Sequence, residues 1–325
     1  MSKVICLRPE KDFTDVGVIV PKSMEVLYLS PDDKNLKEAL KEADALVVPA
    51  VGKPIDSSLL ENSKCKFIQV TGAGVDRLNR AAIEKLGIAV ANVAGGSNDT
   101  IAQYCVGAAI ALLRAMPLSS QTMHHKNYNE IRSQLLKERR RDITGLKVGI
   151  LGFGNIGKAV AKAFDFFGAK VCFFDPLISN NYAGEDFHAI RLPFDQLLKD
   201  ADILSVHVPL MPETMNLLDS HSLASMKDDA VLINPSRGGI LDEAAMAELL
   251  LKNKFQGLAI DVYQQEPPDS SNPLLLLPDE CKQRIIFTPH IAGISSQSWA
   301  SLFNLAWQNV ERVIVTKNDP ENRVY

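Results

Sequence analysis

"VGILGFGNIGKAVAKAFDFFGAKVCFFD" spans residues 148–175 and decides the fold of the segment that contains it. An apolar run leads into three glycines spaced as G-x-G-x-x-G, at Gly152, Gly154 and Gly157, and a helical pattern follows them. A second apolar run then ends in Asp175, roughly 20 residues after the turn. This order of strand, glycine turn, helix, strand and acid predicts a dinucleotide-binding βαβ unit.

Each glycine of this turn has its own physical role. Gly152 permits the tight turn, Gly154 lets a pyrophosphate approach the backbone, and Gly157 lets the helix lie close to the strand. The free N–H groups at the start of the helix, around Asn155 and Ile156, are expected to bind phosphate.

Asp175 sets the expected cofactor choice. Its carboxylate is placed to accept hydrogen bonds from ribose hydroxyls and to repel a 2′-phosphate, so the sequence favours NAD over NADP. The alternative interpretation, ordinary turn glycines followed by a solvent-facing Asp, leaves the ordered context unexplained.

Outward from this unit, short apolar runs alternate with helical patterns along almost the whole chain. Such alternation predicts parallel sheets covered by helices on both faces. One series of strands is expected near residues 3–7, 25–29, 45–49, 66–70 and 88–91, and a second near residues 146–151, 171–175, 203–208, 230–234, 258–261 and 285–287.

A change of texture marks the expected domain boundary. Residues 92–100, "NVAGGSNDT", carry glycines and capping residues before a long helix from about Thr100 to Met116. Residues 117–145 are expected to be an irregular or helical excursion, and a last helix after Ser295 is expected to return to the first domain. The predicted domains are residues 1–98 with 292–325, and residues 99–291.

Composition and charge limit the class of protein. The chain has 325 residues, a net charge of −4, 46% hydrophobic and 23% charged residues, as in ordinary globular proteins. The one basic run, residues 137–141, is interrupted by Glu138 and is interpreted as a solvated helix face, which argues against a nucleic-acid partner.

Membrane, disulfide and metal sites are not expected either. The longest apolar stretch, Tyr104–Leu113, is too short to span a bilayer. Five widely spaced cysteines without a C-x-x-C pair argue against a disulfide framework and a zinc site. The sequence therefore predicts a protein of a reducing compartment, the cytoplasm, with no metal and no membrane partner.

Polar residues follow the expected strands of the second series. His207, the segment Asn234–Gly239, Asp261 and His290 each come directly after an apolar run. Carboxyl ends of parallel strands are where doubly wound sheets bind ligands. Each of these residues has an ordinary interpretation when taken alone: a surface arginine for Arg237, a solvated carboxylate for Glu266 and a half-buried histidine for His290. Their joint placement favours a ligand site.

With these residues the sequence resembles the D-isomer-specific 2-hydroxyacid dehydrogenases from about Gly72 to Arg312. The resemblance is strongest in "LGFGNIGKAVA", "HVPLMPET", "INPSRGGILDEAAMAELL", "AIDVYQQEP" and "FTPHIAGISSQS". It implies an α/β fold of two doubly wound parallel-sheet domains, a Rossmann NAD domain and a flavodoxin-like substrate domain, with a cleft between them. It also implies a homodimer.

The resemblance implies a mechanism as well. The family's catalytic order of Arg, Glu and His falls on Arg237, Glu266 and His290. Arg237 is expected to bind the carboxylate and polarise the carbonyl of a 2-oxo acid, and the nicotinamide to deliver hydride to C2. His290 is expected to exchange the proton, and Glu266 to fix its tautomer and raise its proton affinity.

The remaining site residues are carried over from the same resemblance. Asp261 is similar to the family position that contacts the nicotinamide carboxamide, and backbone N–H groups of the loop at residues 71–74 are expected to hold the substrate carboxylate. Further expected cofactor contacts are His207, Val208, Pro209, Thr214, Pro235, Ser236 and Gly293; the expected substrate contacts are Val51, Gly72, Ala73 and Gly74, with Arg237 and His290.

Two departures and two alternative functions stay open. Gln103 stands where the family commonly has Glu, and Ala73 is smaller than the branched residue often found there. Glyoxylate, hydroxypyruvate, pyruvate, a bulkier acid and phosphohydroxypyruvate therefore all remain possible substrates.

A formate dehydrogenase of the same superfamily generally has Gln in place of Glu266. An NAD-sensing corepressor-like binding protein would keep all three catalytic residues, so the motif does not exclude it.

Overall fold

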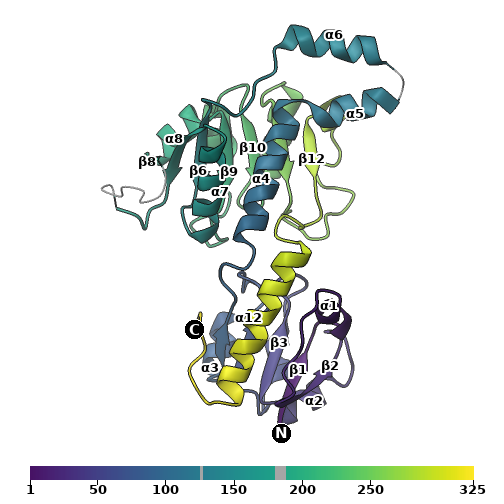
Figure 1. Cartoon of the computed structure of the whole chain (residues 1–325), viewed down its shortest axis with the longest axis vertical. Helices are drawn as coiled ribbons and strands as arrows, with labels where there is room; N and C mark the ends of the chain where they lie inside the picture. The colour runs from purple at the N-terminus through teal and green to yellow at the C-terminus, as the bar shows by residue number, and fades with distance from the viewer. Residues whose placement is uncertain (125–126, 180–187) are drawn as a thin grey trace. The chain divides into compact units, whose positions relative to one another are not determined.

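A computed structural model describes residues 1–124, 127–179 and 188–325 (Figure 1). The chain divides into two compact units. Unit 1 consists of Met1–Ser97 and Ile294–Tyr325, and unit 2 consists of Asn98–Gly293. Each unit is a parallel sheet covered by helices on both faces, which confirms the predicted fold class.

Unit 1 contains five parallel strands in the order β2-β1-β3-β4-β5, the flavodoxin-like order. β3 and β4 are buried along their whole length, which explains their uninterrupted apolar sequences. The strands are β1 Ser2–Cys6, β2 Met24–Tyr28, β3 Ala45–Val48, β4 Phe67–Val70 and β5 Ala89–Ala91.

Two apolar cores lie on the two faces of this sheet. α12 (Ser296–Ile314) and α1 (Glu10–Thr14) cover one face, where Phe13 packs edge-on against Phe303 and Trp307. The other face is covered by α2 (Leu36–Glu42), the 3₁₀ turn η1 (Ser57–Leu60) and α3 (Arg80–Lys85).

Unit 2 contains seven parallel strands in the order β12-β11-β10-β9-β6-β7-β8. The direction of winding reverses between β6 and β9, so the topological switch point lies there. The strands are β6 Lys147–Leu151, β7 Lys170–Phe174, β8 Ala189–Arg191, β9 Ile203–Val206, β10 Val231–Asn234, β11 Gly257–Ile260 and β12 Ile285–Phe287.

α4 (Asn98–Leu113) and α7 (Asn155–Phe166) cover one face of the sheet of unit 2, where they pack against each other and share one apolar core. α8 (Phe194–Asp200), α9 (Ser220–Ser225) and α10 (Glu243–Leu251) cover the other face. α5 (Met116–His124) and α6 (Tyr128–Glu138) extend away from the sheet, and α11 spans Asp279–Lys282 (Figure 1).

The predicted long helix ends slightly earlier than expected. α4 ends at Leu113, not at Met116, and Ala115 takes a left-handed conformation with φ 50° before α5 begins at Met116. Pro117 stands in the first turn of α5, where proline is tolerated, whereas the interior of a continuous helix would exclude it. The predicted excursion is helical in α5 and α6 and irregular at residues 139–145; residues 125 and 126 lie outside the described residues.

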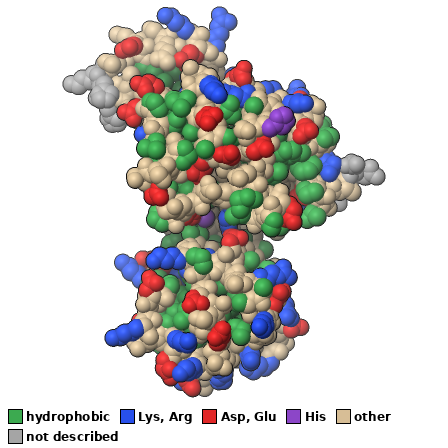
Figure 2. Space-filling model, turned by 180° about the vertical axis from the view of Figure 1, so that it is seen from behind, with side chains coloured by type: hydrophobic (Ala, Val, Ile, Leu, Met, Phe, Trp, Pro, Cys, Tyr) green, Lys and Arg blue, Asp and Glu red, His purple; other side chains and the backbone are tan. Residues whose placement is uncertain are grey.

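The basic run at residues 137–141 is a solvated helix face only in its first part, where Lys137 and Glu138 are exposed on α6. α6 ends at Glu138, and Arg139 caps it in the left-handed conformation. Arg141 is half-buried and pairs with the carboxylates of Asp202 and Asp229. Figure 2 shows charged side chains of both signs interspersed on the visible face of each unit.

No single helix in the described part of the chain is long and apolar enough to cross a membrane. The bent pair Asn98–Leu113 and Met116–Met123 meets the criteria of length and composition only when the two are taken together.

Candidate active site

The carboxyl ends of the strands of unit 2 meet at one edge of its sheet, because all seven strands are parallel. Along this edge, the predicted site residues follow the order of the strands. They are His290 after β12, Asp261 and Glu266 after β11, Arg237 after β10, His207 after β9, the glycine turn after β6 and Asp175 after β7.

The glycine turn has the geometry of a phosphate cradle. Gly152 has φ 90°, and a Cβ there would stand 2.6 Å from the carbonyl oxygen of His207. A Cβ on Gly157 would stand 2.1 Å from the carbonyl oxygen of Gly152, so α7 lies against the turn. Nothing lies within 4 Å of the corresponding point on Gly154, the N-cap of α7. The open space and the N–H groups of the helix start fit a dinucleotide pyrophosphate.

Asp175 connects the glycine turn to the end of β7. One carboxylate oxygen accepts a hydrogen bond from the backbone N–H of Phe153 at 2.9 Å, and the other accepts one from Leu177 at 2.9 Å. Its side chain is therefore fixed beside the cradle while the residue remains partly exposed.

His290 and Glu266 form a hydrogen-bonded pair. The distance from His290 Nδ1 to Glu266 Oε2 is 2.8 Å, and their side chains are 23% and 29% exposed. Burial raises the pKa of Glu266, but the hydrogen bond and charge of His290, the N–H of Tyr263 and the charge of Arg237 together bring the pKa below its ordinary value. Since Nδ1 faces the carboxylate, Nε2 is the ring nitrogen left to meet a substrate.

The backbone of His290 is strained and closely held. His290 has φ 55°, a left-handed conformation that is uncommon for a residue with a side chain. Its N–H donates to the carbonyl of Asp261 at 2.8 Å, and the next two N–H groups, of Ile291 and Ala292, donate to the Asp261 carboxylate at 2.8 Å each.

Asp261 is buried and closely held by protein groups, and its expected contact with the nicotinamide stays a prediction. The residue is 0% exposed, and its carboxylate accepts three hydrogen bonds, from the Thr288 hydroxyl and the two N–H groups of the His290 segment. In this structure it anchors the segment that carries His290.

A tight turn after β10 carries Arg237 and packs against the loop that leads to Glu266. The buried side chain of Asn234 accepts hydrogen bonds from the N–H and hydroxyl of Ser236 and donates one to the carbonyl of Arg237. A Cβ on Gly238 would stand 1.8 Å from the carbonyl oxygen of Tyr263, so the turn packs directly on the loop that leads to Glu266.

The other expected cofactor contacts are spread along the same edge. His207 hydrogen-bonds Ser205 through Nε2 at 2.8 Å, and burial lowers its pKa to about 3, so the ring is neutral. Thr214 holds a turn by donating to the carbonyl of Pro209 and accepting from the N–H of Met211. Pro235 is buried, and Val208, Ser236 and Gly293 are partly buried.

The expected substrate contacts lie at the carboxyl edge of the sheet of unit 1. Val51 follows β3 and is 45% exposed, and Gly72, Ala73 and Gly74 follow β4. A Cβ on Gly72 would stand 2.7 Å from the Cβ of Ala50, and the carbonyl of Ala73 accepts a hydrogen bond from the Asn92 side chain.

Two supporting residues were missed from the sequence. Glu243 on α10 is buried; its carboxylate accepts hydrogen bonds from the N–H of Gln264 and the side chain of Asn272, and burial raises its pKa. Arg8, after β1, pairs with Asp12 and lies over the rings of Trp299 and Phe303. Glu243 lies within the segment "INPSRGGILDEAAMAELL" quoted above, but the resemblance assigned it no role, and Arg8 lies in no quoted motif.

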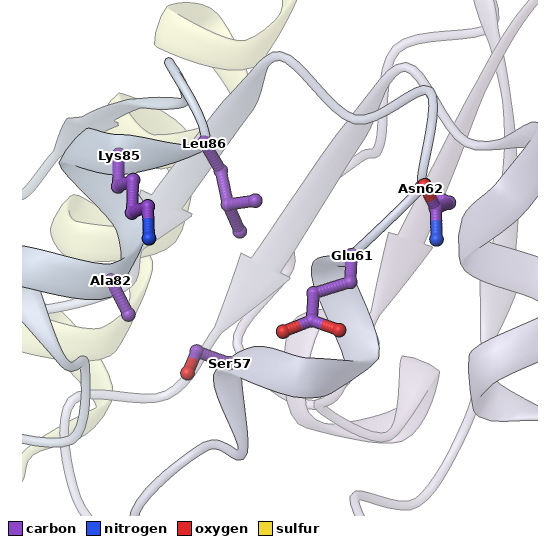
Figure 3. A pocket seen from close by; sticks show the side chains of 6 residues that line it. All are labelled: Ser57, Glu61, Asn62, Ala82, Lys85 and Leu86. Carbon is purple, nitrogen blue, oxygen red and sulfur yellow. The ribbon is translucent and has the colours of Figure 1, made fainter.

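A shallow pocket of about 440 Å³ in unit 1 lies apart from these residues (Figure 3). It is formed between η1 and α3 by Ser57, Glu61, Asn62, Ala82, Lys85 and Leu86. None of the predicted site residues lines it.

Comparison with known proteins identifies the family. The profile of the D-isomer specific 2-hydroxyacid dehydrogenase, NAD binding domain, matches residues 106–292. The chain is 30% identical to a glycerate dehydrogenase of Methylorubrum extorquens, over 90% of this chain and 88% of that protein. It is 29% identical to a D-3-phosphoglycerate dehydrogenase of Methanocaldococcus jannaschii, over 86% of this chain but only 52% of that protein, so it spans about half of that relative.

The fold comparison agrees with the sequence comparison. A D-lactate dehydrogenase of Treponema pallidum superposes with a TM-score of 0.75 at 26% identity, covering 100% of both chains. The expected family and the expected NAD cofactor are therefore confirmed. The chain belongs to the D-isomer-specific 2-hydroxyacid dehydrogenase family, with the family's NAD-binding domain in unit 2.

Proposed function

We propose that this chain interconverts a D-2-hydroxy acid and its 2-oxo acid, with His290 as the acid–base residue. The observation that carries the proposal is the 2.8 Å pair of His290 and Glu266, which shares one sheet edge with the glycine cradle. A carboxylate-paired imidazole at a dinucleotide site suits proton exchange coupled to hydride transfer.

The residues divide the work of the reaction. Bound NADH supplies the hydride that reduces C2 of the oxo acid. Arg237 binds the carboxylate and polarises the carbonyl, for which a planar guanidinium is suited. His290 Nε2 donates a proton to the developing alkoxide and takes it back in the reverse direction. Glu266 holds Nδ1–H, fixes the tautomer and stabilises the protonated ring.

Unit 1 supplies the substrate contacts in this proposal. Backbone N–H groups of Gly72, Ala73 and Gly74 bind the substrate carboxylate, and Val51 contacts the substrate side chain. The tight contact of Gly72 with Ala50 and the hydrogen bond from Asn92 to Ala73 support this, because both fix the loop in one conformation.

We also propose that the protein is a cytoplasmic homodimer. Four large apolar side chains on α5 and α6 are exposed: Met116 (50%), Met123 (46%), Tyr128 (55%) and Leu136 (61%). Such a concentration on one helical hairpin fits a second copy of the chain as partner. The five unpaired cysteines fit a reducing compartment. Light scattering of the wild type and of Leu136→Asp tests the dimer; a monomeric wild type contradicts it.

The decisive experiment is NADH oxidation with a panel of 2-oxo acids that includes glyoxylate, pyruvate, hydroxypyruvate, phosphohydroxypyruvate and a branched-chain acid. The most reactive acid identifies the substrate class, and NADPH is assayed in parallel. For that acid, His290→Ala should lower kcat by roughly 10²- to 10⁴-fold, the usual contribution of general acid–base catalysis.

The matched control is His221→Ala. His221 is an exposed histidine of α9 in the same unit, so its loss should leave the rate unchanged. Clear NADH binding without turnover of any acid would contradict the proposed function and favour a binding protein built on this fold.

A further inference from the structure

A chain of hydrogen bonds runs from α4 into the segment that carries His290. The hydroxyls of Tyr104 and Thr288 are 2.8 Å apart, and the hydroxyl of Thr288 lies 2.5 Å from Asp261 Oδ1. Asp261 in turn holds the N–H groups of Ile291 and Ala292. These residues come from α4, from the end of β11 and from the end of β12, and α4 packs against both strands.

Simple proton counting fixes the direction of this chain. A carboxylate has no proton to give, so Thr288 donates its single hydroxyl proton to Asp261. The Thr288 oxygen then accepts from the hydroxyl of Tyr104. Burial raises the pKa of Tyr104, which keeps the phenol protonated as the donor.

The His290 segment needs such support. A non-glycine residue at φ 55° stores strain and persists only where its surroundings fix it. Asp261 accepts from three successive N–H groups, from His290 through its main-chain carbonyl and from Ile291 and Ala292 through its carboxylate. The orientation of the Asp261 carboxylate therefore helps to fix the backbone that carries the imidazole, while Glu266 holds the ring itself. Thr288 is itself held on its other side, since Tyr263 donates its hydroxyl to the Thr288 carbonyl at 3.1 Å.

We propose that Tyr104 is a positioning residue for His290, acting through Thr288 and Asp261. The hydroxyl of Tyr104 polarises and orients Thr288, Thr288 orients the Asp261 carboxylate, and Asp261 fixes the strained turn that presents the imidazole. Tyr104 touches neither substrate nor cofactor in this role. The kinetic part of the test rests on the proposed function; the structural part does not.

The first test is amide hydrogen exchange in the full-length protein. Tyr104→Phe removes one hydroxyl and keeps the ring. The N–H groups of Ile291 and Ala292 should exchange about 3- to 10-fold faster, while those of β6 remain unchanged. The ring signals of His290, identified with His290→Gln, should shift or broaden. The control, Tyr28→Phe in unit 1, should leave both readouts as in the wild type.

The second test separates the relay from a general packing effect. Thr288→Val should give a larger increase in exchange than Tyr104→Phe, and Thr288→Ser should restore wild-type rates because it keeps the hydroxyl. The double variant Tyr104→Phe/Thr288→Val should exchange no faster than Thr288→Val alone. On the most reactive oxo acid, Tyr104→Phe should lower kcat about 3- to 10-fold with KM for NADH unchanged.

Additive effects in the double variant, or wild-type exchange at Ile291 and Ala292 in Tyr104→Phe, would overturn the proposal. A wild type that turns over no acid would overturn the proposed function instead, and the exchange data would still decide the role of Tyr104.

Discussion

The two halves of the carboxyl edge in unit 2 are built in different ways. The half at β6 and β7 is made by backbone: glycines that admit close approach, and the N–H groups at the start of α7. The half at β10, β11 and β12 is made by side chains, namely Arg237, Glu266 and His290. Glu266 accepts a hydrogen bond from His290, and the buried side chain of Asn234 holds the turn that carries Arg237. The half at β6 and β7 depends on the absence of side chains at its glycines. The half at β10, β11 and β12 depends on functional side chains held in defined positions.

This difference has a consequence for tolerance to substitution. In the glycine half, adding one methyl group either blocks folding or blocks a ligand, depending on the position. In the histidine half, removing one functional group changes the chemistry while leaving the fold in place. The predictions below test this contrast, from the largest expected effect to the smallest.

After His290→Ala, Arg237→Lys should have the largest effect on catalysis. A lysine cannot reproduce the planar, bidentate fork, so kcat/KM should fall by roughly 10²- to 10³-fold, as on loss of one oxyanion donor. NADH affinity and the melting temperature should stay near wild type. Exposed Arg114→Lys is the control. A loss of NADH binding equal to the loss of rate would assign Arg237 to the cofactor half.

Gly157→Ala and Gly154→Ala should separate folding from cofactor binding. At Gly157 the added Cβ meets a backbone oxygen at 2.1 Å, so the free energy of unfolding should drop by more than about 3 kcal/mol. At Gly154 the space is open, so the fold should be kept while NADH binds roughly tenfold or more weakly. Calorimetry and fluorescence titration measure the two effects. Tight NADH binding by Gly154→Ala would contradict the cradle.

Glu266→Gln should lower kcat roughly 10- to 100-fold, because the amide oxygen still accepts from Nδ1–H but the charge that stabilises the protonated ring is lost. The folded-state pKa of Glu266 lies below its ordinary value. Its carboxylate therefore stabilises the fold above the unfolded pKa of about 4.3, and this contribution disappears as pH falls through the folded pKa. The stability gap between wild type and variant should shrink in acid.

Urea unfolding between neutral and acidic pH measures that gap. Glu248→Gln, on the exposed face of α10, is the control. A gap that stays constant with pH would mean that the Glu266 carboxylate contributes nothing through its charge.

Asp175→Asn should have the smallest effect. The amide oxygen can still accept an N–H from Phe153 or Leu177, but the charge that repels a 2′-phosphate is lost. The preference for NADH over NADPH should fall by roughly 5- to 10-fold, about 1 kcal/mol for one exposed charge pair. An unchanged ratio of kcat/KM values would remove Asp175 from cofactor choice.

The sequence predicted those helices, strands and turns whose determining contacts are between residues close together in the chain. The strand, glycine turn and helix at residues 148–166 follow from steric rules that act within a few residues. The predicted end of the long helix before Pro117 is also a local signal, and α4 ends at Leu113 close to it. Strand β8 was not predicted, because its three residues carry too short a pattern of apolar residues. The ion pairs of Arg141 were not predicted either, because its partners, Asp202 and Asp229, lie far along the chain.

The sequence by itself determined the fold class and the NAD cofactor, because glycine spacing and alternating apolar runs report backbone geometry directly. It determined the family through the resemblance of the motifs around Arg237, Glu266 and His290. Only the tertiary structure decided what Asp261 and Tyr104 contact. Asp261 lies between the ends of β11 and β12, and Tyr104 reaches Thr288 from α4, 184 positions away in sequence. A hydrogen bond requires distance and direction in space, and these come from the packing of α4 on the sheet, which no local pattern encodes.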